Sequence, residues 1–308
     1  MNKDTSPVPT GRARVWLRAA RLRTLPLSCS GVVLGGGLAA AEGGFRSLVF
    51  VLSVLTAVLL QILSNFANDY GDAVKGADGP GRVGPRRSVA SGELTARAMF
   101  RAVLLMVGLS LAAGLALLGV SFGPDLARWG VFLALGLASV AAAVLYTMGK
   151  HPYGYRGYGD CFVFVFFGVV AVAGSYALYD VPLTRLPGLP ACAAGFFATA
   201  VLNINNIRDM ENDSANGKET LALRLGPHRA RVYHLVLIGL GLGCWAVWFM
   251  ATRRWWGLAL LAAAVPLVRS AWLVYGSLRP AVLDAQLRAT SLAAGFLNII
   301  MALALPWL

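Results

Sequence analysis

Long apolar runs, separated by short polar or charged connectors, dominate this chain. The runs are solidly apolar and do not alternate with polar residues, so they predict membrane-crossing helices rather than the strands of a barrel. Each is close to the roughly 20 residues that a helix needs to cross a bilayer. Nine such runs follow one another, at residues 25–41, 48–67, 98–120, 127–147, 161–179, 187–207, 233–251, 255–275 and 289–306. The predicted fold class is all-α: a polytopic membrane protein with about nine transmembrane helices in a bundle.

The N-terminal end of the chain differs from the rest. Residues 1–23 form a basic segment, of which residues 12–23 are predicted to form a helix lying at the membrane surface. Residues 24–308 then form a single transmembrane domain. The first apolar run also fits a signal peptide, because a basic flank precedes it. That run leads directly into further helices, however, which favours a first membrane helix.

Composition and charge agree with a membrane protein. Apolar residues make up 57% of the chain and charged residues 13%, far from the balance of a soluble domain. Of the 27 Lys and Arg residues, 21 lie in the N-terminal segment and around the connectors after the second, fourth, sixth and eighth helices. The positive-inside rule therefore places these parts on the cytoplasmic side of the cell (plasma) membrane. Anionic lipid headgroups account for the net charge of +13, so no nucleic-acid partner is predicted.

The second apolar run ends in a polar stretch, NFANDYGDAVKGAD, at residues 65–78. On a helix with about 100° per residue, Asn65, Asp69 and Asp72 fall within a narrow sector. Asn68 lies four residues before Asp72. Carboxylates and carboxamides at the mouth of an apolar helix are costly unless a cation binds them. This stretch is therefore a candidate cation site.

A second polar stretch, NINNIRDMENDSANGK, closes the sixth run in the same way at residues 203–218. Its Asp209 and Asp213 lie one helical turn apart. Hard oxygen ligands on two facing helices suit Mg²⁺, which typically binds one or two carboxylates together with substrate phosphate. The two stretches together predict a site for a divalent metal and a phosphate-bearing substrate.

Two connectors on the same side of the membrane are long. Residues 76–94 (GADGPGRVGPRRSVASGEL) are rich in Gly and Pro, and a connector of this length is typical of a lid. Its Arg82, Arg86 and Arg87 fit two roles equally well. Their guanidinium groups match phosphate geometry, and they also suit lipid headgroups.

The connector at residues 146–160 (YTMGKHPYGYRGYGD) is the other one. Tyr146 and Lys150 are one helical turn apart and are predicted to face the same pocket. The later tyrosines of this connector are interpreted as members of an interfacial aromatic belt: Tyr153, Tyr155 and Tyr158.

The chain also repeats itself loosely. Each acidic stretch ends the second helix of a four-helix unit and leads into a long basic connector. Helices one to four and five to eight are therefore predicted to be related halves, with the ninth helix added. The site would lie between the halves.

Four segments of the chain resemble the UbiA superfamily of intramembrane aromatic prenyltransferases. They are NDYGDAVKGAD, RVGPRRSVASG, YTMGKHPYGYRGYGD and NNIRDMENDSANGKETLALRLG, which occur in the order typical of that family and cover essentially the whole chain. The branch that acts on 4-hydroxybenzoate resembles Asn-Asp-x-x-Asp-x-x-x-Asp at the first motif. Here the last of those positions is Gly76, and an aspartate comes only at Asp78. The chain is therefore more similar to the branch that acts on 1,4-dihydroxy-2-naphthoate in menaquinone synthesis.

The resemblance implies a bundle with a central cavity and roles for specific residues. The implied Mg²⁺ ligands are Asn68, Asp69, Asp72, Asp209 and Asp213. The residues implied to hold diphosphate or to orient the substrates are Asn65, Lys75, Arg87, Tyr146, Lys150, Asn206 and Lys218. Asp72, Asp209 and Lys75 are implied to be central to catalysis. Further candidates are Asp78, Arg86 and Arg208.

The reaction that the resemblance implies joins polyprenyl diphosphate to 1,4-dihydroxy-2-naphthoate and releases diphosphate and CO₂. Metal and basic side chains neutralise diphosphate as a leaving group, and an apolar bundle excludes the water that would trap an allylic cation. The polyprenyl tail is expected in a groove that opens laterally into the bilayer. Two alternatives remain: another aromatic acceptor such as 4-hydroxybenzoate, and a secondary transporter. The transporter is disfavoured because the acids lie at helix ends and few charges lie near mid-membrane.

Overall fold

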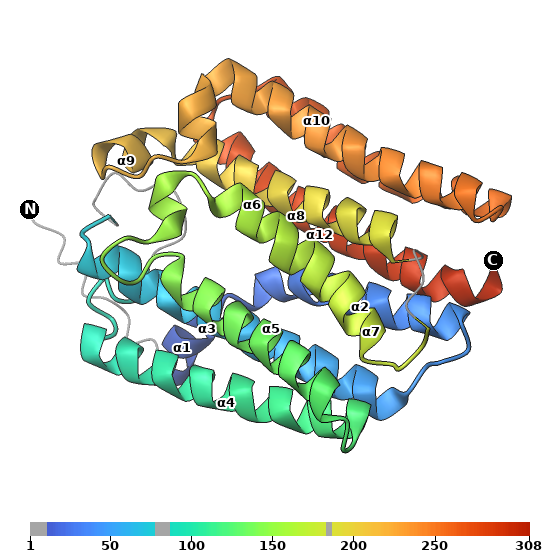
Figure 1. The fold of residues 1–308 in the computed structure, drawn as a ribbon. Helices are drawn as coiled ribbons and strands as arrows, with labels where there is room; N and C mark the ends of the chain where they lie inside the picture. The colour runs from blue at the N-terminus through green and yellow to red at the C-terminus, as the bar shows by residue number, and fades with distance from the viewer. Residues whose placement is uncertain (1–10, 78–86, 183–186) are drawn as a thin grey trace, which may run out of the picture.

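The computed structural model describes residues 11–77, 87–182 and 187–308, which form a bundle of long helices (Figure 1). Within these residues, nine helical segments are long and apolar enough to cross a membrane, and the predicted fold class is confirmed. The segments are Arg12–Ala41, Ser47–Val74, Ala96–Phe122, Leu126–Leu145, Gly159–Ala177, Gly188–Arg208, Leu221–Ala251, Trp255–Tyr275 and Pro280–Trp307.

The first four segments contain the elements α1 (Arg12–Ala20), η1 (Leu22–Thr24), α2 (Leu25–Ala41), α3 (Ser47–Val74), α4 (Ala96–Phe122) and α5 (Leu126–Leu145). The predicted N-terminal basic helix is α1, which ends where Arg21 adopts the left-handed conformation with φ 50°. α1 packs on α3, and the Trp16 and Phe66 rings meet edge to face with centroids 5.6 Å apart. The basic segment is thus anchored to the helix that carries the first acidic stretch.

The remaining elements are η2 (Tyr153–Arg156), α6 (Gly159–Val163), η3 (Phe164–Gly174), α7 (Ser175–Ala177), α8 (Gly188–Arg208), α9 (Met210–Ala215), α10 (Leu221–Ala251), η4 (Trp255–Ala264), α11 (Val265–Tyr275), α12 (Pro280–Ala304) and η5 (Leu305–Trp307). η3 is wound as a π-helix and continues α6 into α7 without a break. α10 begins earlier than its apolar run predicts, and a kink at Gly226 (φ 76°), just before Pro227, interrupts it. Proline lacks the N–H of the helical ladder, which explains the kink.

Helix α8 lies at the centre of the second half and packs against α10, α12 and η3. Small residues permit this close approach, as is typical of membrane helices. A Cβ atom on Gly168 of η3 would lie 2.6 Å from the Cα atom of Gly195 of α8, so neither position accommodates a larger residue without displacement. Tight packing along α8 fixes where its last turn, which carries the second acidic stretch, emerges from the bundle.

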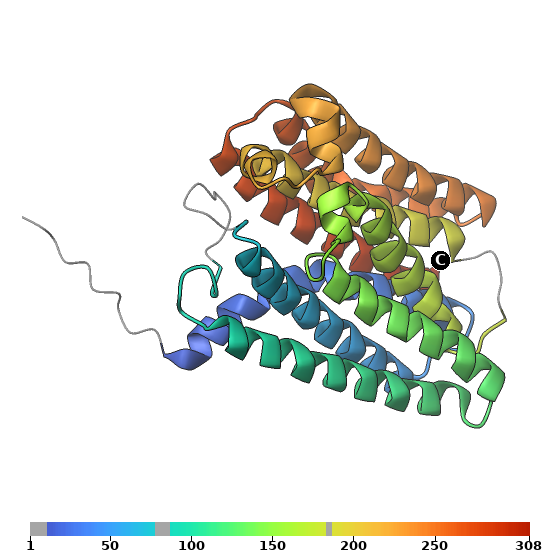
Figure 2. The same cartoon turned by 60° about the vertical axis from the view of Figure 1, so that its left-hand side comes forward.

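The two acidic stretches emerge at one end of the bundle. α3 ends at Val74 and α8 ends at Arg208, and the short helix α9 follows α8 directly. Both views place α9 and the end of α3 away from the C-terminus (Figures 1 and 2). The relation between helices one to four and five to eight as halves stays a prediction.

Candidate active site

A cavity of about 610 Å³ lies between the ends of α3 and α8. Its wall includes Asn68 and Asp72 of the first acidic stretch and Asp209 and Asp213 of the second. The structure therefore brings the two acidic motifs together at one cavity, as their spacing predicts. Asn65 and Arg87 also line it.

The deeper part of the cavity is apolar. It is lined from α4, α5 and the α6–η3 segment by side chains that include Leu111, Leu115, Leu133, Leu137, Phe162, Phe166, Phe167 and Val170. Three of these side chains, Leu115, Leu133 and Leu137, are exposed. The cavity thus combines a polar end near the connectors with an apolar channel that α4, α5 and the α6–η3 segment line.

Asp72 is buried at the polar end, and both of its carboxylate oxygens are bonded. Arg87 donates from Nη2 to Oδ2 over 2.6 Å, and the Tyr155 hydroxyl donates to Oδ1 over 2.8 Å. Burying a carboxylate is costly unless it is paired and hydrogen-bonded, and both conditions hold here. Asp72 is therefore held as an anion in a fixed orientation at the cavity wall.

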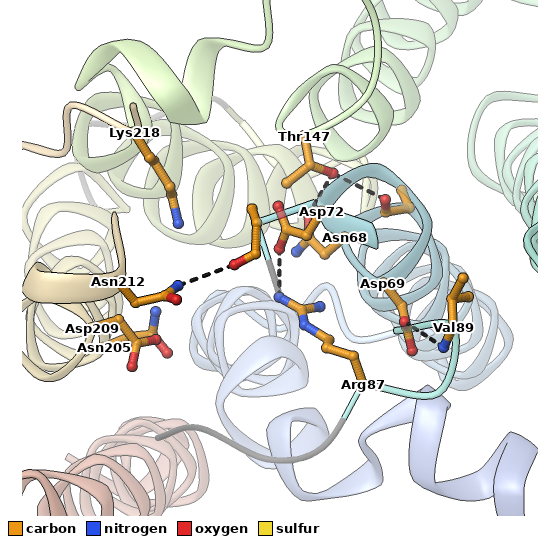
Figure 3. Close-up of polar contacts among 12 residues, drawn as sticks. Asn68, Asp69, Asp72, Arg87, Val89, Thr147, Asn205, Asp209, Asn212 and Lys218 are labelled. Atoms are coloured by element: carbon orange, nitrogen blue, oxygen red, sulfur yellow. Dashed lines mark hydrogen bonds and ion pairs between the residues drawn. The ribbon is translucent and has the colours of Figure 1, made fainter. Parts of the chain in front are cut away.

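Asp69 points the other way, although it shares the helix with Asp72 (Figure 3). It accepts from the backbone N–H groups of Ser88, over 3.0 Å, and Val89, over 3.1 Å. Because both oxygens satisfy donors of the connector after α3, Asp69 anchors that connector and does not line the cavity. The structure does not bring this implied metal ligand to the other candidates.

Asn68 and Asn65 contact neighbouring segments while they line the cavity. Thr147 donates from Oγ1 to Asn68 Oδ1 over 3.3 Å. Asn65 donates from Nδ2 to the Ala20 carbonyl over 2.9 Å and also to Thr24 Oγ1 over 3.3 Å. These bonds fix the end of α3 against the connector after α5 and against the α1–α2 junction.

Asp209 is the C-cap of α8 and is held by its neighbour Arg208. Arg208 donates from Nε to Asp209 Oδ1 and from Nη2 to Oδ2, each over 2.8 Å. It also donates from Nη1 to Asp284 of α12 over 2.8 Å and from Nη2 to Asn205 over 2.8 Å. Fork-like pairing of this kind is both strong and directional.

Asp213 of α9 has one oxygen that is free for a ligand. Lys218 lies 3.4 Å from Oδ1, whereas the buried Oδ2 has no hydrogen-bond partner. Burial raises the pKa of Asp213 to about 6; Lys218 opposes this shift, and Asp209 and Asp72 add to it. A buried carboxylate whose pKa is raised by the charge of other carboxylates favours a bound cation. The orphaned oxygen and the surrounding amide and carboxylate oxygens therefore fit Mg²⁺.

The carboxylates remain distributed around the cavity. Among the described residues, no three His, Cys, Asp or Glu side chains form a ready-made metal cluster. Asn212 lines the cavity between the two motifs and donates from Nδ2 to the Ala77 carbonyl over 3.1 Å (Figure 3). An oxygen-rich ligand such as diphosphate would have to supply further metal ligands.

The two lysines near the polar end of the cavity differ in their exposure. Lys218 lines the cavity and its side chain is 12% exposed. Lys75 is exposed, and its Nζ donates to the Gly149 carbonyl over 2.8 Å. The two ammonium groups lie over the same ring, 5.7 Å (Lys218) and 6.0 Å (Lys75) from the centroid of Tyr155.

Three of the implied substrate-binding residues do not line the cavity: Lys75, Lys150 and Asn206. Lys150 is exposed, and Asn206 is buried within the bundle. The expectation that Tyr146 and Lys150 face the same pocket is wrong, because α5 ends at Leu145 and only Tyr146 lines the cavity. Tyr146 itself lines the cavity, and burial raises the pKa of its phenol, which keeps it a neutral donor.

Sequence reasoning missed four residues of the site: Tyr155, Asn205, Asn212 and Asp284. Asn205 and Asn212 lie within the second acidic stretch, so their proximity to its aspartates was a usable signal. The pattern of the connector predicts a belt role for Tyr155, and no local pattern points to Asp284. Asp78, Arg82 and Arg86 lie outside the described residues.

Several known proteins are similar to this chain in sequence. The chain is 41% identical to a 1,4-dihydroxy-2-naphthoate octaprenyltransferase of Haemophilus influenzae over 96% of both chains. It is 44% identical to the Escherichia coli protein of the same name over 95% of both chains. A relative with that name in Mycobacterium tuberculosis is 38% identical over 82% of this chain and 83% of its own.

Solved structures share the fold. A UbiA homolog from Aeropyrum pernix superposes with a TM-score of 0.67 at 15% identity, over 96% of this chain and 98% of that one. A UbiA homolog from Archaeoglobus fulgidus, bound to DMAPP and Mg²⁺, superposes with a TM-score of 0.60 at 19% identity, over 92% and 99%. Residues 30–305 match the model of the UbiA prenyltransferase family, nearly the whole described chain. The chain therefore belongs to the UbiA prenyltransferase family.

Proposed function

We propose that this protein transfers a polyprenyl group from polyprenyl diphosphate to 1,4-dihydroxy-2-naphthoate, giving demethylmenaquinol, diphosphate and CO₂ in menaquinone biosynthesis. The observation that carries the proposal is that Asp72 and Asp209, from two different helices, line one cavity whose inner part is apolar. Such a cavity suits a substrate with a charged head and a lipid tail. Near-full-length similarity to 1,4-dihydroxy-2-naphthoate octaprenyltransferases supports the acceptor.

The residues that would hold Mg²⁺ are Asn68, Asp72, Asp209 and Asp213. Bound there, the ion would neutralise the diphosphate and make it a better leaving group. UbiA homologs of the same fold were solved with Mg²⁺ and prenyl diphosphates, which supports this choice of ion. Asp69 is left out of the set because it does not line the cavity and its oxygens accept from the backbone of the connector.

The basic residues at the polar end would bind the diphosphate. Lys218 and Arg87 line the cavity, and Lys75 lies outside the lining, with its Nζ 6.0 Å from the ring centroid of the lining residue Tyr155. Their positive charges offset the charge that builds up on the departing diphosphate. Tyr146 would add a neutral hydrogen-bond donor.

The reaction breaks the bond between the allylic carbon and the diphosphate oxygen, and its electron pair leaves with the diphosphate. The ring carbon that bears the carboxylate then forms a bond to the allylic carbon. Loss of CO₂ returns the electron pair of the carbon–carboxylate bond to the ring. The apolar wall, including Phe162 and Phe166, excludes the water that would otherwise capture the cation.

The polyprenyl tail would occupy the apolar channel and leave the bundle laterally beside α5, whose Leu133 and Leu137 line the channel and are exposed. The protein would lie in the plasma membrane, and the distribution of Lys and Arg supports a cytoplasmic location for the polar end of the cavity.

Purified protein supplied with Mg²⁺, a polyprenyl diphosphate and a panel of aromatic acceptors tests the function. We expect mass spectrometry to detect prenylated, decarboxylated product from 1,4-dihydroxy-2-naphthoate. Excess EDTA should abolish it, and added Mg²⁺ should restore it. Product from 4-hydroxybenzoate alone would reassign the acceptor. Full activity in EDTA would refute the metal–diphosphate mechanism.

A further inference from the structure

Tyr155 lies in η2, on the connector between α5 and α6, and its side chain lines the cavity. Its backbone is fixed to the second motif, because the N–H of Glu219 donates to the Tyr155 carbonyl over 3.0 Å. Glu219 directly follows Lys218. The connector therefore sets the position of this tyrosine relative to the residues that would bind diphosphate.

The side chain of Tyr155 contacts charged groups of both motifs. Its hydroxyl donates to Asp72 Oδ1 over 2.8 Å, and its ring lies 6.0 Å from Lys75 Nζ and 5.7 Å from Lys218 Nζ. A hydrogen bond to a carboxylate orients it without neutralising its charge. An aromatic ring attracts ammonium groups near its face, so one ring can hold both lysines close to the cavity despite their mutual repulsion.

The neighbouring tyrosines do not share this arrangement. The Tyr153 hydroxyl donates to the Ala142 carbonyl over 2.7 Å, and its ring stacks on Phe162 with centroids 4.0 Å apart. Tyr158 is 58% exposed. The interpretation as belt residues therefore does not fit Tyr155, whose hydroxyl meets a buried carboxylate.

We propose that Tyr155 is a positioning residue that acts through two separate parts: its hydroxyl orients Asp72, and its ring holds Lys75 and Lys218 where a diphosphate binds. This inference rests on the proposed function, because it assumes that Asp72 binds the metal and that the lysines bind diphosphate. The two parts are separable by substitution. Tyr155→Phe removes only the hydroxyl, whereas Tyr155→Leu removes the hydroxyl and the ring.

Binding of geranyl S-thiolodiphosphate, a substrate analogue with a poor leaving group, separates the two parts. Its affinity is measured by calorimetry on the full chain in lipid nanodiscs, once in EDTA and once in Mg²⁺. We expect the affinity of Tyr155→Phe in EDTA to stay within about twofold of the wild-type value. The factor by which Mg²⁺ increases the affinity should be about tenfold smaller than in the wild type, which is the order of a hydrogen bond to a charged group. Tyr155→Leu should in addition weaken the affinity in EDTA by about three- to tenfold.

The control variant is Tyr158→Phe, which should match the wild type in both conditions, and the thermal midpoint of each variant reports its folding. Equal affinities for Tyr155→Phe, Tyr155→Leu and wild type would overturn the inference alone. So would an equal loss in EDTA for Tyr155→Phe and Tyr155→Leu, because the ring would then have no role of its own. A wild type that gains no affinity from Mg²⁺ would instead overturn the proposed function, and this inference with it.

Discussion

Arg208 pairs with its own neighbour Asp209 through two hydrogen bonds of 2.8 Å, one from Nε and one from Nη2. The same guanidinium reaches Asp284 of α12 over 2.8 Å, and the Arg208 side chain is only 2% exposed. A buried guanidinium between two carboxylates fixes the orientation of both. The last membrane-crossing segment thus contributes to the geometry of the second acidic motif.

Replacing Asp284 should therefore affect the site from a distance. We expect Asp284→Asn to lower turnover by about tenfold and to raise the Mg²⁺ concentration for half-maximal activity, because Arg208 loses a charged partner and Asp209 is held less firmly. A Mg²⁺ titration of purified enzyme measures both effects. The matched control is Asp180→Asn at the opposite end of the bundle, where Asp180 pairs with Arg128 at the surface. An exposed pair contributes little, so this control should retain activity.

Substituting Asp72 or Asp209 should lower turnover far more than substituting Asp284. Asp72→Asn and Asp209→Asn each remove one negative charge from the wall that would face the metal, and we expect each to lower turnover by about a hundredfold or more. The thermal midpoint should also fall, because asparagine keeps one acceptor oxygen for the two donors that each aspartate binds and does not balance the charge of the buried guanidinium. If either variant retained half of the wild-type turnover, the assignment of that residue as a metal ligand would be wrong.

Asp69 should behave differently from Asp72, although both lie in the same motif. Asp69→Ala removes the acceptor of two backbone N–H groups, those of Ser88 and Val89. We expect a loss of stability of about 1–3 kcal/mol per unsatisfied group, seen as a lower thermal midpoint. The Mg²⁺ concentration for half-maximal activity should stay close to that of the wild type. A large rise in that concentration, with an unchanged midpoint, would instead support the metal-ligand role that the family resemblance implied.

The apolar channel gives a prediction about tail length. Gly136 of α5 lines the cavity, and a Cβ atom added there would meet nothing within 4 Å. Gly136→Phe should fold normally and fill part of the channel. We expect KM for a long polyprenyl diphosphate to rise by about tenfold, which corresponds to the loss of a few buried methylene groups. KM for geranyl diphosphate should stay the same. Gly130→Phe is the control, because Gly130 is equally open but does not line the cavity. Equal effects of both variants on the long substrate would argue against this path for the tail.

The membrane topology follows from local composition, which explains why it was predictable. The run at residues 127–147 corresponds to α5 at Leu126–Leu145, and the run at 255–275 corresponds to Trp255–Tyr275. The apolar run predicts a start at residue 233, whereas α10 begins at Leu221, because its first turns contain charged residues and a kink at Gly226. Hydropathy detects the membrane-spanning part of a helix and not the polar turns that extend it.

The candidate site was predictable only in part. Asp72 and Asp209 follow from acids at the mouths of apolar helices, and both line the cavity. Asp69 was grouped with Asp72 by helical spacing, yet the backbone of the connector captures both of its oxygens. Spacing along one helix predicts which residues share a sector, but it does not predict which neighbouring segment packs against that sector.

By itself, the sequence determined the number of membrane-crossing helices, the end of the bundle where the acids gather and the family, because each depends on local hydropathy or on contiguous motifs. Only the tertiary structure decided that Asp69 serves the connector, that Asp284 supports Arg208 and that Tyr155 joins the two motifs. These contacts link segments far apart in the chain. They depend on how the helices pack against one another, which no local pattern encodes.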